Sequence, residues 1–205
     1  MTVIIDYQMG NLRSVQKAIQ RVGGDATISS DPNVIATAER LVLPGVGGFG
    51  DAMREIRRRD LVRPIRDYID GGRPFLGICL GLQLLFDVGE ENGTHEGLGV
   101  IPGRVVRFEP RPDRKVPHMG WNQVSPRGDH PMIADVAEGE YFYFVHSYYV
   151  EPDDDSVTSL VCDYQQPFTA AIGRDNVFAT QFHPEKSQDA GMKLLSGFLN
   201  TPILA

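Results

Sequence analysis

The sequence is poor in the features that mark secreted, membrane-spanning and nucleic-acid-binding proteins. Its 205 residues include two cysteines and one tryptophan. No apolar stretch approaches the roughly 20 residues that a membrane-spanning helix needs, and the first residues lack the basic segment and apolar core of a signal peptide. The two cysteines could pair, but nothing suggests a secreted fold stapled by disulfides. We therefore expect a cytoplasmic protein with a free thiol at Cys79.

Positive charge is also scarce. A net charge of -7 argues against a non-specific nucleic-acid binder, because such proteins need basic surfaces to meet the phosphate backbone. No grouping of histidine, cysteine and acidic residues has the spacing of metal ligands, so we predict neither a metal nor another cofactor. With no internal repeat, low-complexity segment or linker, residues 1–205 are expected to form one domain.

The first half of the chain alternates short apolar strands with amphipathic helices. Repeated units of this kind predict an α/β fold with a mostly parallel sheet and helices on both faces. We expect strands over residues 3–6, 27–28, 41–43 and 74–78, helices that begin at Asn11 and Asp31, and further helices over residues 51–58, 61–69 and 80–86.

The second half is rich in β-forming residues joined by turn chemistry. These segments are expected to pack as antiparallel or mixed strands beside the parallel core. We predict strands over residues 104–108, 141–150, 157–163, 168–173 and 177–182, a hairpin turn over residues 173–176, and a closing helix over residues 189–199.

A cysteine lies where a predicted strand turns into a predicted helix, in the run Gly77-Ile78-Cys79-Leu80-Gly81. Small residues on both sides permit a tight turn, and a helix N-terminus favours the thiolate form. The backbone N–H of Leu80 then points to where an oxyanion would form. A small buried core cysteine is the alternative interpretation.

A second candidate group is His183-Pro184-Glu185, far downstream. Residues two apart on a strand face the same side, so Glu185 could hold one imidazole nitrogen while the other meets a thiol. Pro184 cannot donate to a ladder, which indicates a strand end or an edge. Alone, this tripeptide is more typical of a surface turn. Together with Cys79 it supplies nucleophile, base and orienting group for acyl transfer.

The third candidate is the glycine-rich segment over residues 44–50, which follows a predicted strand. It lacks the Lys-Ser/Thr ending of a phosphate-binding P-loop, so we reject that function. Such a turn can aim backbone N–H groups at an anion, and a second oxyanion donor is the role that fits. A plain loop is the alternative.

These three segments, in this order, resemble the class I (triad-type) glutamine amidotransferases over nearly the whole chain. The resemblance implies a flavodoxin-like sheet with additional antiparallel strands. Four further segments resemble one group in this class, the glutaminase subunits of imidazole glycerol phosphate synthases of histidine biosynthesis: residues 5–11, 44–47, 117–122 and 144–149.

The resemblance implies a mechanism. Cys79 would attack the side-chain amide of glutamine, and His183 would protonate the departing ammonia and then activate water against the glutamyl thioester. Glu185 would orient His183.

The resemblance also implies the surroundings of that reaction. The oxyanion would be bound by the N–H of Leu80 and by a backbone N–H of the turn at Val46 and Gly47. Gly45 and Gln83 match positions that hold substrate glutamine. For Gln83, an ordinary exposed helix residue is the alternative.

The group passes its ammonia to a separate (β/α)8-barrel cyclase subunit, so the resemblance implies a heterodimer. Trp121, Asn122, Tyr143 and Lys186 lie in segments expected near that partner, although core packing or a solvated lysine would explain each as well. Three other residues are expected to be structural: His118, His146 and Cys162.

Several other functions remain open. The glutaminase could serve a vitamin B6, anthranilate, aminobenzoate or guanylate synthase. The protein could instead be a stand-alone cysteine hydrolase, papain-like for example, or a binding module that kept the fold without turnover. The segments over residues 44–47 and 119–122 disfavour the other synthases, and the paired histidine and glutamate disfavour a stand-alone hydrolase.

Overall fold

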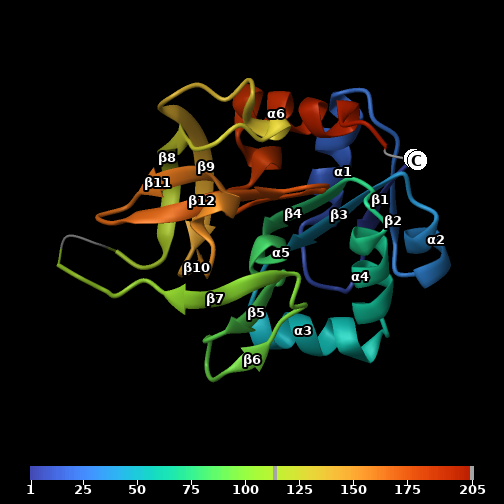
Figure 1. Cartoon of the computed structure of the whole chain (residues 1–205), viewed down its shortest axis with the longest axis horizontal. Coiled ribbons are helices and arrows are strands. Elements are labelled where there is room, and N and C mark those ends of the chain that lie inside the picture. The colour runs from blue at the N-terminus through green and yellow to red at the C-terminus, as the bar shows by residue number, and fades with distance from the viewer. Residues whose placement is uncertain (113–114, 204–205) are drawn as a thin grey trace.

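The computed structural model describes residues 1–112 and 115–203, and its strands form one connected, twisted sheet with helices packed against it (Figure 1). The helices are α1 (Leu12–Arg21), α2 (Pro32–Ala36), α3 (Phe49–Arg58), α4 (Val62–Asp70), α5 (Leu80–Gln83) and α6 (Gln188–Asn200), with 3-10 turns η1 (Pro131–Ile133), η2 (Asp155–Val157) and η3 (Pro184–Lys186).

One half of the sheet is parallel. Its strands lie in the order β2-β1-β3-β4-β13, and their bounds are β1 (Thr2–Ile5), β2 (Ala26–Ser29), β3 (Arg40–Gly45), β4 (Phe75–Cys79) and β13 (Val177–Thr180). Strands β1, β4 and β13 are buried along their whole length, as expected where helices cover both faces.

Side chains alternate between the two faces of this parallel half. On β1, Val3 and Ile5 join the core formed with α3 and α4, whereas Ile4 joins the core formed with α1 and α6. Figure 1 shows these two helix pairs on opposite sides of the strands. The apolar stripe of each helix is therefore buried against one face of the sheet, which holds the strand ends in fixed positions.

The other half consists of mainly antiparallel strands. Strands β12, β10, β7, β5 and β6 continue the sheet beyond β13, while β11, β8 and β9 branch from β12. Their bounds are β5 (Phe86–Gly89), β6 (His95–Glu96), β7 (Ile101–Arg107), β8 (His118–Pro126), β9 (Glu140–His146), β10 (Tyr148–Pro152), β11 (Thr158–Asp163) and β12 (Pro167–Arg174). The predicted α/β class with added antiparallel strands is confirmed.

Three parallel neighbours bring the candidate segments together. Strand β4 lies between β3 and β13, and Gly45 at the end of β3 is the register partner of Cys79 at the end of β4. The carboxyl ends of parallel strands meet at one edge of a sheet. The glycine-rich loop after β3, the cysteine after β4 and the histidine after β13 must therefore meet there.

The predicted helix over residues 80–86 begins at the right residue but is too long. Helix α5 ends at Gln83, and β5 begins at Phe86. The carbonyl of Leu84 accepts from the N–H of Leu98, and that of Leu85 accepts from Val100 and Ile101. Hydrophobic periodicity could not distinguish one long helix from a short helix followed by a strand, because every residue over 80–86 is buried.

Two other predictions fail in the β-rich half. The strand expected over residues 141–150 is broken at Ser147, whose carbonyl accepts from the N–H of Phe108. His183 and Glu185 do not share a strand, because β13 ends at Thr180 and Glu185 lies in η3. Pro184 at the first position of η3 fits that turn.

The hairpin turn over residues 173–176 is confirmed, with Asp175 at a φ of 53°. The closing helix is confirmed as α6, which begins at Gln188. The described helices include none that is long and apolar enough to cross a membrane.

Candidate active site

Cys79 occupies a strained elbow between β4 and α5. Its backbone has φ 54° and ψ -107°, in a region that L residues other than glycine rarely adopt. A Cβ on Gly81 would lie 1.8 Å from the carbonyl oxygen of Leu43, and one on Gly77 would lie 2.8 Å from Cβ of Ala179. The two flanking glycines therefore let the elbow pack closely against its neighbours.

The first helical N–H after the elbow belongs to Leu80. An N–H in the first turn has no partner within its own helix, so it can point at an anion held beside Cys79. The side chain of Leu80 is buried against Gly45, where a Cβ would lie 2.9 Å from that of Leu80. This contact fixes the elbow against the end of β3.

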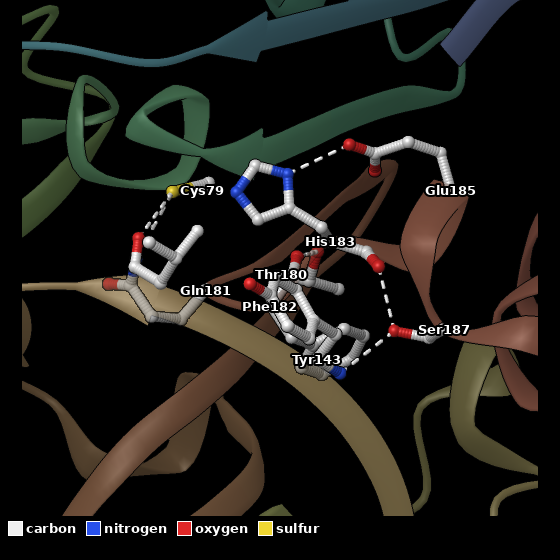
Figure 2. Close-up of polar contacts among 9 residues, drawn as sticks. Cys79, Tyr143, Thr180, Gln181, Phe182, His183, Glu185 and Ser187 are labelled. Carbon is white, nitrogen blue, oxygen red and sulfur yellow. Dashed lines mark hydrogen bonds and ion pairs between the residues drawn. The ribbon is translucent and has the colours of Figure 1, made fainter. Parts of the chain in front are cut away.

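His183 and Glu185 form a buried ion pair beside the elbow. Nδ1 of His183 lies 2.8 Å from Oε1 of Glu185, and the two side chains are only 2% and 1% exposed. Figure 2 shows the imidazole ring between the Cys79 sulfur and this carboxylate. Ser187 clamps the segment, because its hydroxyl donates to the carbonyl of His183 and accepts from the N–H of Tyr143.

The two partners change the protonation of His183. Burial lowers the pKa of this imidazole, but hydrogen bonding and charge attraction from Cys79 and Glu185 outweigh it and raise the pKa to about 10. Within the described residues, Nε2 of His183 meets no hydrogen-bond partner of ordinary geometry. The free nitrogen and the sulfur are thus poised to exchange a proton, since catalytic hydrogen bonds often tighten only around substrate.

Polar groups also surround the sulfur. Nε2 of Gln181 donates to Sγ of Cys79 over 3.7 Å, and the thiol donates to the carbonyl of Val145 over 3.9 Å. Tyr7 lies nearby and donates to the carbonyl of Pro44. Burial, and secondarily the charge of Cys79, raise the pKa of Tyr7 well above its ordinary value, so the phenol stays neutral.

A cavity of about 340 Å³ opens over the elbow. It is lined by Val46, Gly47, Cys79, Leu80, Gln83, Glu91, Pro117, Val145, His146, Ser147, Tyr148 and His183. Cys79 and His183 therefore line one pocket large enough for an amino acid, and Glu185 contacts His183 without lining the pocket itself. The size and the mixed polar lining suit a small polar substrate.

Gln83 is a buried pocket residue and not an exposed helix residue. Its Nε2 donates to the carbonyl of Tyr148 over 3.0 Å and to Oε1 of Gln181 over 3.1 Å. Both N–H groups are used, so its carbonyl oxygen is the atom left for a substrate. Gly45, the other predicted substrate residue, does not line the cavity and packs against Tyr7 and Leu80.

The predicted oxyanion loop also lines the cavity, through Val46 and Gly47. Val46 is exposed, and Gly47 has a φ of +99°, which a residue with a side chain rarely adopts. Glu91 holds the loop, because its carboxylate accepts from the N–H of Phe49 over 2.6 Å at the start of α3. A carboxylate at a helix N-terminus is stabilised by the helix dipole.

The sequence interpretation missed several pocket residues. Glu91 and Gln181 contribute to the site but lie outside the recognised motifs, and Tyr148 lies in the recognised segment over residues 144–149 but was given no role. Gln181 directly follows β13 and lies two residues before His183. This position at the end of a late strand was the only feature of the sequence that could have indicated a role for Gln181.

Three of the four predicted interface residues lie together. The rings of Trp121 and Tyr143, cross-strand partners on β8 and β9, meet edge to face at 6.1 Å, and Nζ of Lys186 lies 5.8 Å from the Tyr143 ring. Asn122 is not part of this group, because it follows Trp121 on the strand and donates to the carbonyl of Asp163 on the opposite face.

The remaining titratable groups carry no metal site: the described part of the chain contains no group of three or more metal-ligand side chains. Both cysteines are free thiols. Cys162 is buried in β11 as expected for a core residue, and burial raises its pKa to about 12.

The family model for class-I glutamine amidotransferases matches residues 3–201. The chain belongs to the class I glutamine amidotransferases. Solved structures with low sequence identity have the same fold. A glutamine amidotransferase covers 95% of this chain and 98% of its own length with a TM-score of 0.73 at 17% identity. A structure titled PurLQS from Thermotoga maritima covers 97% of both chains with a TM-score of 0.76 at 19% identity.

Curated relatives narrow the group within the amidotransferases. A protein from Rhodopirellula baltica is 60% identical over 203 residues, which is 99% of this chain and 98% of that protein. One from Syntrophotalea carbinolica is 55% identical over 97% of this chain and 98% of its own length. Both are named imidazole glycerol phosphate synthase subunit HisH, and this amidotransferase belongs with them.

Proposed function

We propose that this chain is the glutaminase subunit of an imidazole glycerol phosphate synthase, with Cys79, His183 and Glu185 as its catalytic triad. The observation that carries the proposal is the buried His183–Glu185 pair beside the Cys79 sulfur, at the carboxyl edge of an amidotransferase sheet. Relatives that match nearly the full chain are named for that synthase.

The proposed reaction begins at the sulfur. The Cys79 thiolate adds to the side-chain amide carbon of glutamine, and the carbonyl oxygen becomes an oxyanion. His183, protonated at Nε2, gives this proton to the amide nitrogen, so that ammonia leaves and a glutamyl thioester remains. His183 then takes a proton from water, which attacks the thioester and releases glutamate with the free thiolate.

Fixed groups around the cavity would stabilise this reaction. The N–H of Leu80 and a backbone N–H at Val46 or Gly47 would bind the oxyanion from two walls of the pocket. The carbonyl oxygen of Gln83 can accept from the substrate, and the charge of Glu91 suits the α-ammonium group of free glutamine. Glu185 keeps His183 in the correct orientation.

The exposed apolar face of β8 and β9 indicates that this protein binds a protein partner. We define this face by Met119, Trp121, Tyr141, Tyr143 and Lys186; Met119, Trp121 and Tyr141 are 62%, 45% and 52% exposed. Exposed aromatic residues and methionine are enriched at protein interfaces. The proposed occupant is the (β/α)8-barrel cyclase subunit, which would receive ammonia from the pocket, because free ammonia would otherwise be lost to solvent.

Ammonia release from glutamine, with and without a co-expressed partner identified by mass, tests this function. We expect slow hydrolysis by the chain alone and stimulation by the partner with its ligand. In the complex, Cys79→Ala should abolish hydrolysis of glutamine but leave synthesis from added ammonia. Hydrolysis that persists in Cys79→Ala would refute the nucleophile, and full activity without a partner would refute the coupling.

A further inference from the structure

Two buried histidines lie beside the pocket but take no part in the proposed triad. His118 on β8 and His146 on β9 are register partners, and they are 3% and 6% exposed. Their ring nitrogens, Nδ1 of His118 and Nε2 of His146, lie 3.0 Å apart. His146 also lines the cavity. Two adjacent imidazoles in a core must arrange their protons so that one donates and the other accepts.

The surroundings determine where those protons lie. Nδ1 of His146 is 2.8 Å from the carbonyl of Tyr148, which can only accept, so Nδ1 carries the proton. Burial lowers the pKa of His146 to about 3 and that of His118 to about 4, so both rings are neutral near pH 7. Nε2 of His146 therefore accepts, and Nδ1 of His118 donates to it.

The chain of hydrogen bonds continues to the far side of β8. Nε2 of the neutral His118 must accept, and its partner is Nδ2 of Asn122 at 3.2 Å. The second N–H of that amide donates to the carbonyl of Asp163 over 2.9 Å, which fixes the orientation of the amide. Gly120, between the two residues, has a φ of +130°, a conformation that favours glycine.

The same chain reaches the reacting sulfur from its other end. The carbonyl of Tyr148 accepts both from His146 and from Nε2 of Gln83. Gln83 also donates to Oε1 of Gln181, which turns Nε2 of Gln181 toward Sγ of Cys79. Each amide has one orientation that satisfies these contacts. The Tyr148 carbonyl is thus the junction between the histidine pair and the groups that touch Cys79.

We propose that Asn122, His118 and His146 are positioning residues for glutamine hydrolysis. They form a relay in which each residue donates a hydrogen bond to the next and His146 donates to the carbonyl of Tyr148. The relay holds this carbonyl in place, and the carbonyl in turn holds Gln83, which aims the Gln181 amide at Cys79. This inference rests on the proposed function. When Cys79 is a thiolate it can no longer donate to Val145, so the Gln181 N–H becomes the polar contact that stabilises it.

The relay begins on the strand that carries the partner-facing aromatics. Asn122 directly follows Trp121 on β8, and the two side chains lie on opposite faces. A shift of β8 on binding would move the terminal donor of the relay together with Trp121. The relay therefore offers a physical connection between the exposed apolar face and the sulfur.

Nitrogen NMR of the histidine-labelled full chain tests the relay without any catalysis. Both His118 and His146 should be neutral with the proton on Nδ1 from pH 7 down to pH 5. A proton on Nε2 of either ring, or a ring that becomes charged in this range, would overturn the proposal. This result does not depend on glutamine turnover. The NMR experiment can therefore refute the relay without refuting the proposed function, and a failure of the proposed function would leave the NMR result unchanged.

Asn122→Asp tests the role in catalysis. A carboxylate cannot donate, so His118 must place its proton on Nε2 and accept at Nδ1. His146 must then move its proton from Nδ1 to Nε2, so it no longer donates to the carbonyl of Tyr148. In the complex with the co-expressed partner, we expect kcat for glutamine hydrolysis to fall about tenfold while KM changes less than about twofold. Alkylation of Cys79 at pH 7 should slow as well.

Gln123→Glu is the matched control, because it makes the same chemical change at the next residue of β8, where the exposed side chain donates to the carbonyl of Gly139. It should leave kcat, alkylation and both histidine tautomers unchanged. An unchanged kcat in Asn122→Asp, or an equal loss in Gln123→Glu, would refute the relay. If Asn122→Asp fails to fold, the tautomers of the unaltered chain still decide the proposal.

Discussion

Nδ1 of His183 and Oε1 of Glu185 lie 2.8 Å apart in a pair of side chains that are almost completely buried. The second carboxylate oxygen, Oε2, has no hydrogen-bond partner within the described residues. A buried carboxylate with one bond is costly unless it faces a positive charge. The pair is therefore most stable with a protonated His183, the form that gives a proton to the leaving ammonia.

Glu185→Gln should test this pairing. The amide keeps the shape of the side chain but removes the charge that supports a protonated His183, so kcat for glutamine hydrolysis should fall by about 10²- to 10⁴-fold. Asp189→Asn, an exposed change in the first turn of α6, is the control and should have normal activity. A Glu185→Gln variant with more than about half of the normal kcat would contradict the orienting role.

The pH dependence of stability should have two limbs. Below pH 6.5, the unfolded chain binds protons that buried His118 and His146 refuse, since their pKa values are about 4 and about 3 in the folded protein. The stability that depends on the neutral His118 and His146 is therefore fully present above pH 6.5 and is lost as the pH falls. His183 acts in the opposite direction, because its raised pKa of about 10 gives stability that is present below pH 6.5 and lost as the pH rises.

Chemical denaturation from pH 5 to pH 9 measures the free energy of unfolding on the acid side and on the alkaline side. We expect maximal stability near pH 6.5 to 7, and a weaker alkaline decline in His183→Asn, which lacks the titrating group. An alkaline slope that is identical in this variant would show that His183 holds no extra proton in the folded protein.

The two cysteines should differ sharply toward a diazoketone analogue of glutamine. Cys79 lines the cavity, whereas Cys162 is 1% exposed in β11 and its pKa is raised to about 12 by burial. Peptide mass mapping should find the label on Cys79 alone, and excess glutamine should protect it. Labelling of Cys162 first would contradict the assignment of the nucleophile.

Gly81→Ala should destabilise the fold at the elbow. The new Cβ would lie 1.8 Å from the backbone oxygen of Leu43, so the strand or the helix must shift. We expect a loss of about 3 kcal/mol or more in the free energy of unfolding, measured by urea denaturation.

Gly197→Ala is the matched control in α6, because a Cβ there would have no neighbour within 4 Å apart from the adjacent residues and the backbone of its own helix. Alanine is a better helix former, so this variant should gain about 0.5–1 kcal/mol. Equal losses in the two variants would show that close packing at the elbow is not the cause.

Local patterns predicted much of the fold. The alternation of strands and helices through residue 78 was correct, since short buried strands flanked by turn residues and amphipathic helices have distinct periods. The helix predicted over residues 80–86 failed because long-range backbone contacts to residues 98–101 replaced helical bonds there. The strand over residues 141–150 is divided because the chain pairs with β8 up to His146 and with β7 from Tyr148 onward.

The candidate site was likewise predictable in its residue types but not in its three-dimensional contacts. The sequence by itself determined which chemical groups the protein carries: a cysteine between glycines, a histidine with a glutamate two residues away, and a glycine-rich turn. Their types and local spacing are enough to indicate acyl transfer from a thiol, because that reaction needs these groups.

Only the tertiary structure decided how those groups meet. Strand order places β4 between β3 and β13, so segments more than a hundred residues apart share one sheet edge. The 3-10 turn, and not a strand, brings Glu185 to His183. The contacts of Gln181 with Cys79, of Gln83 with Tyr148 and between the two histidines also depend on strand pairing, which local sequence cannot encode because each bond joins residues distant along the chain.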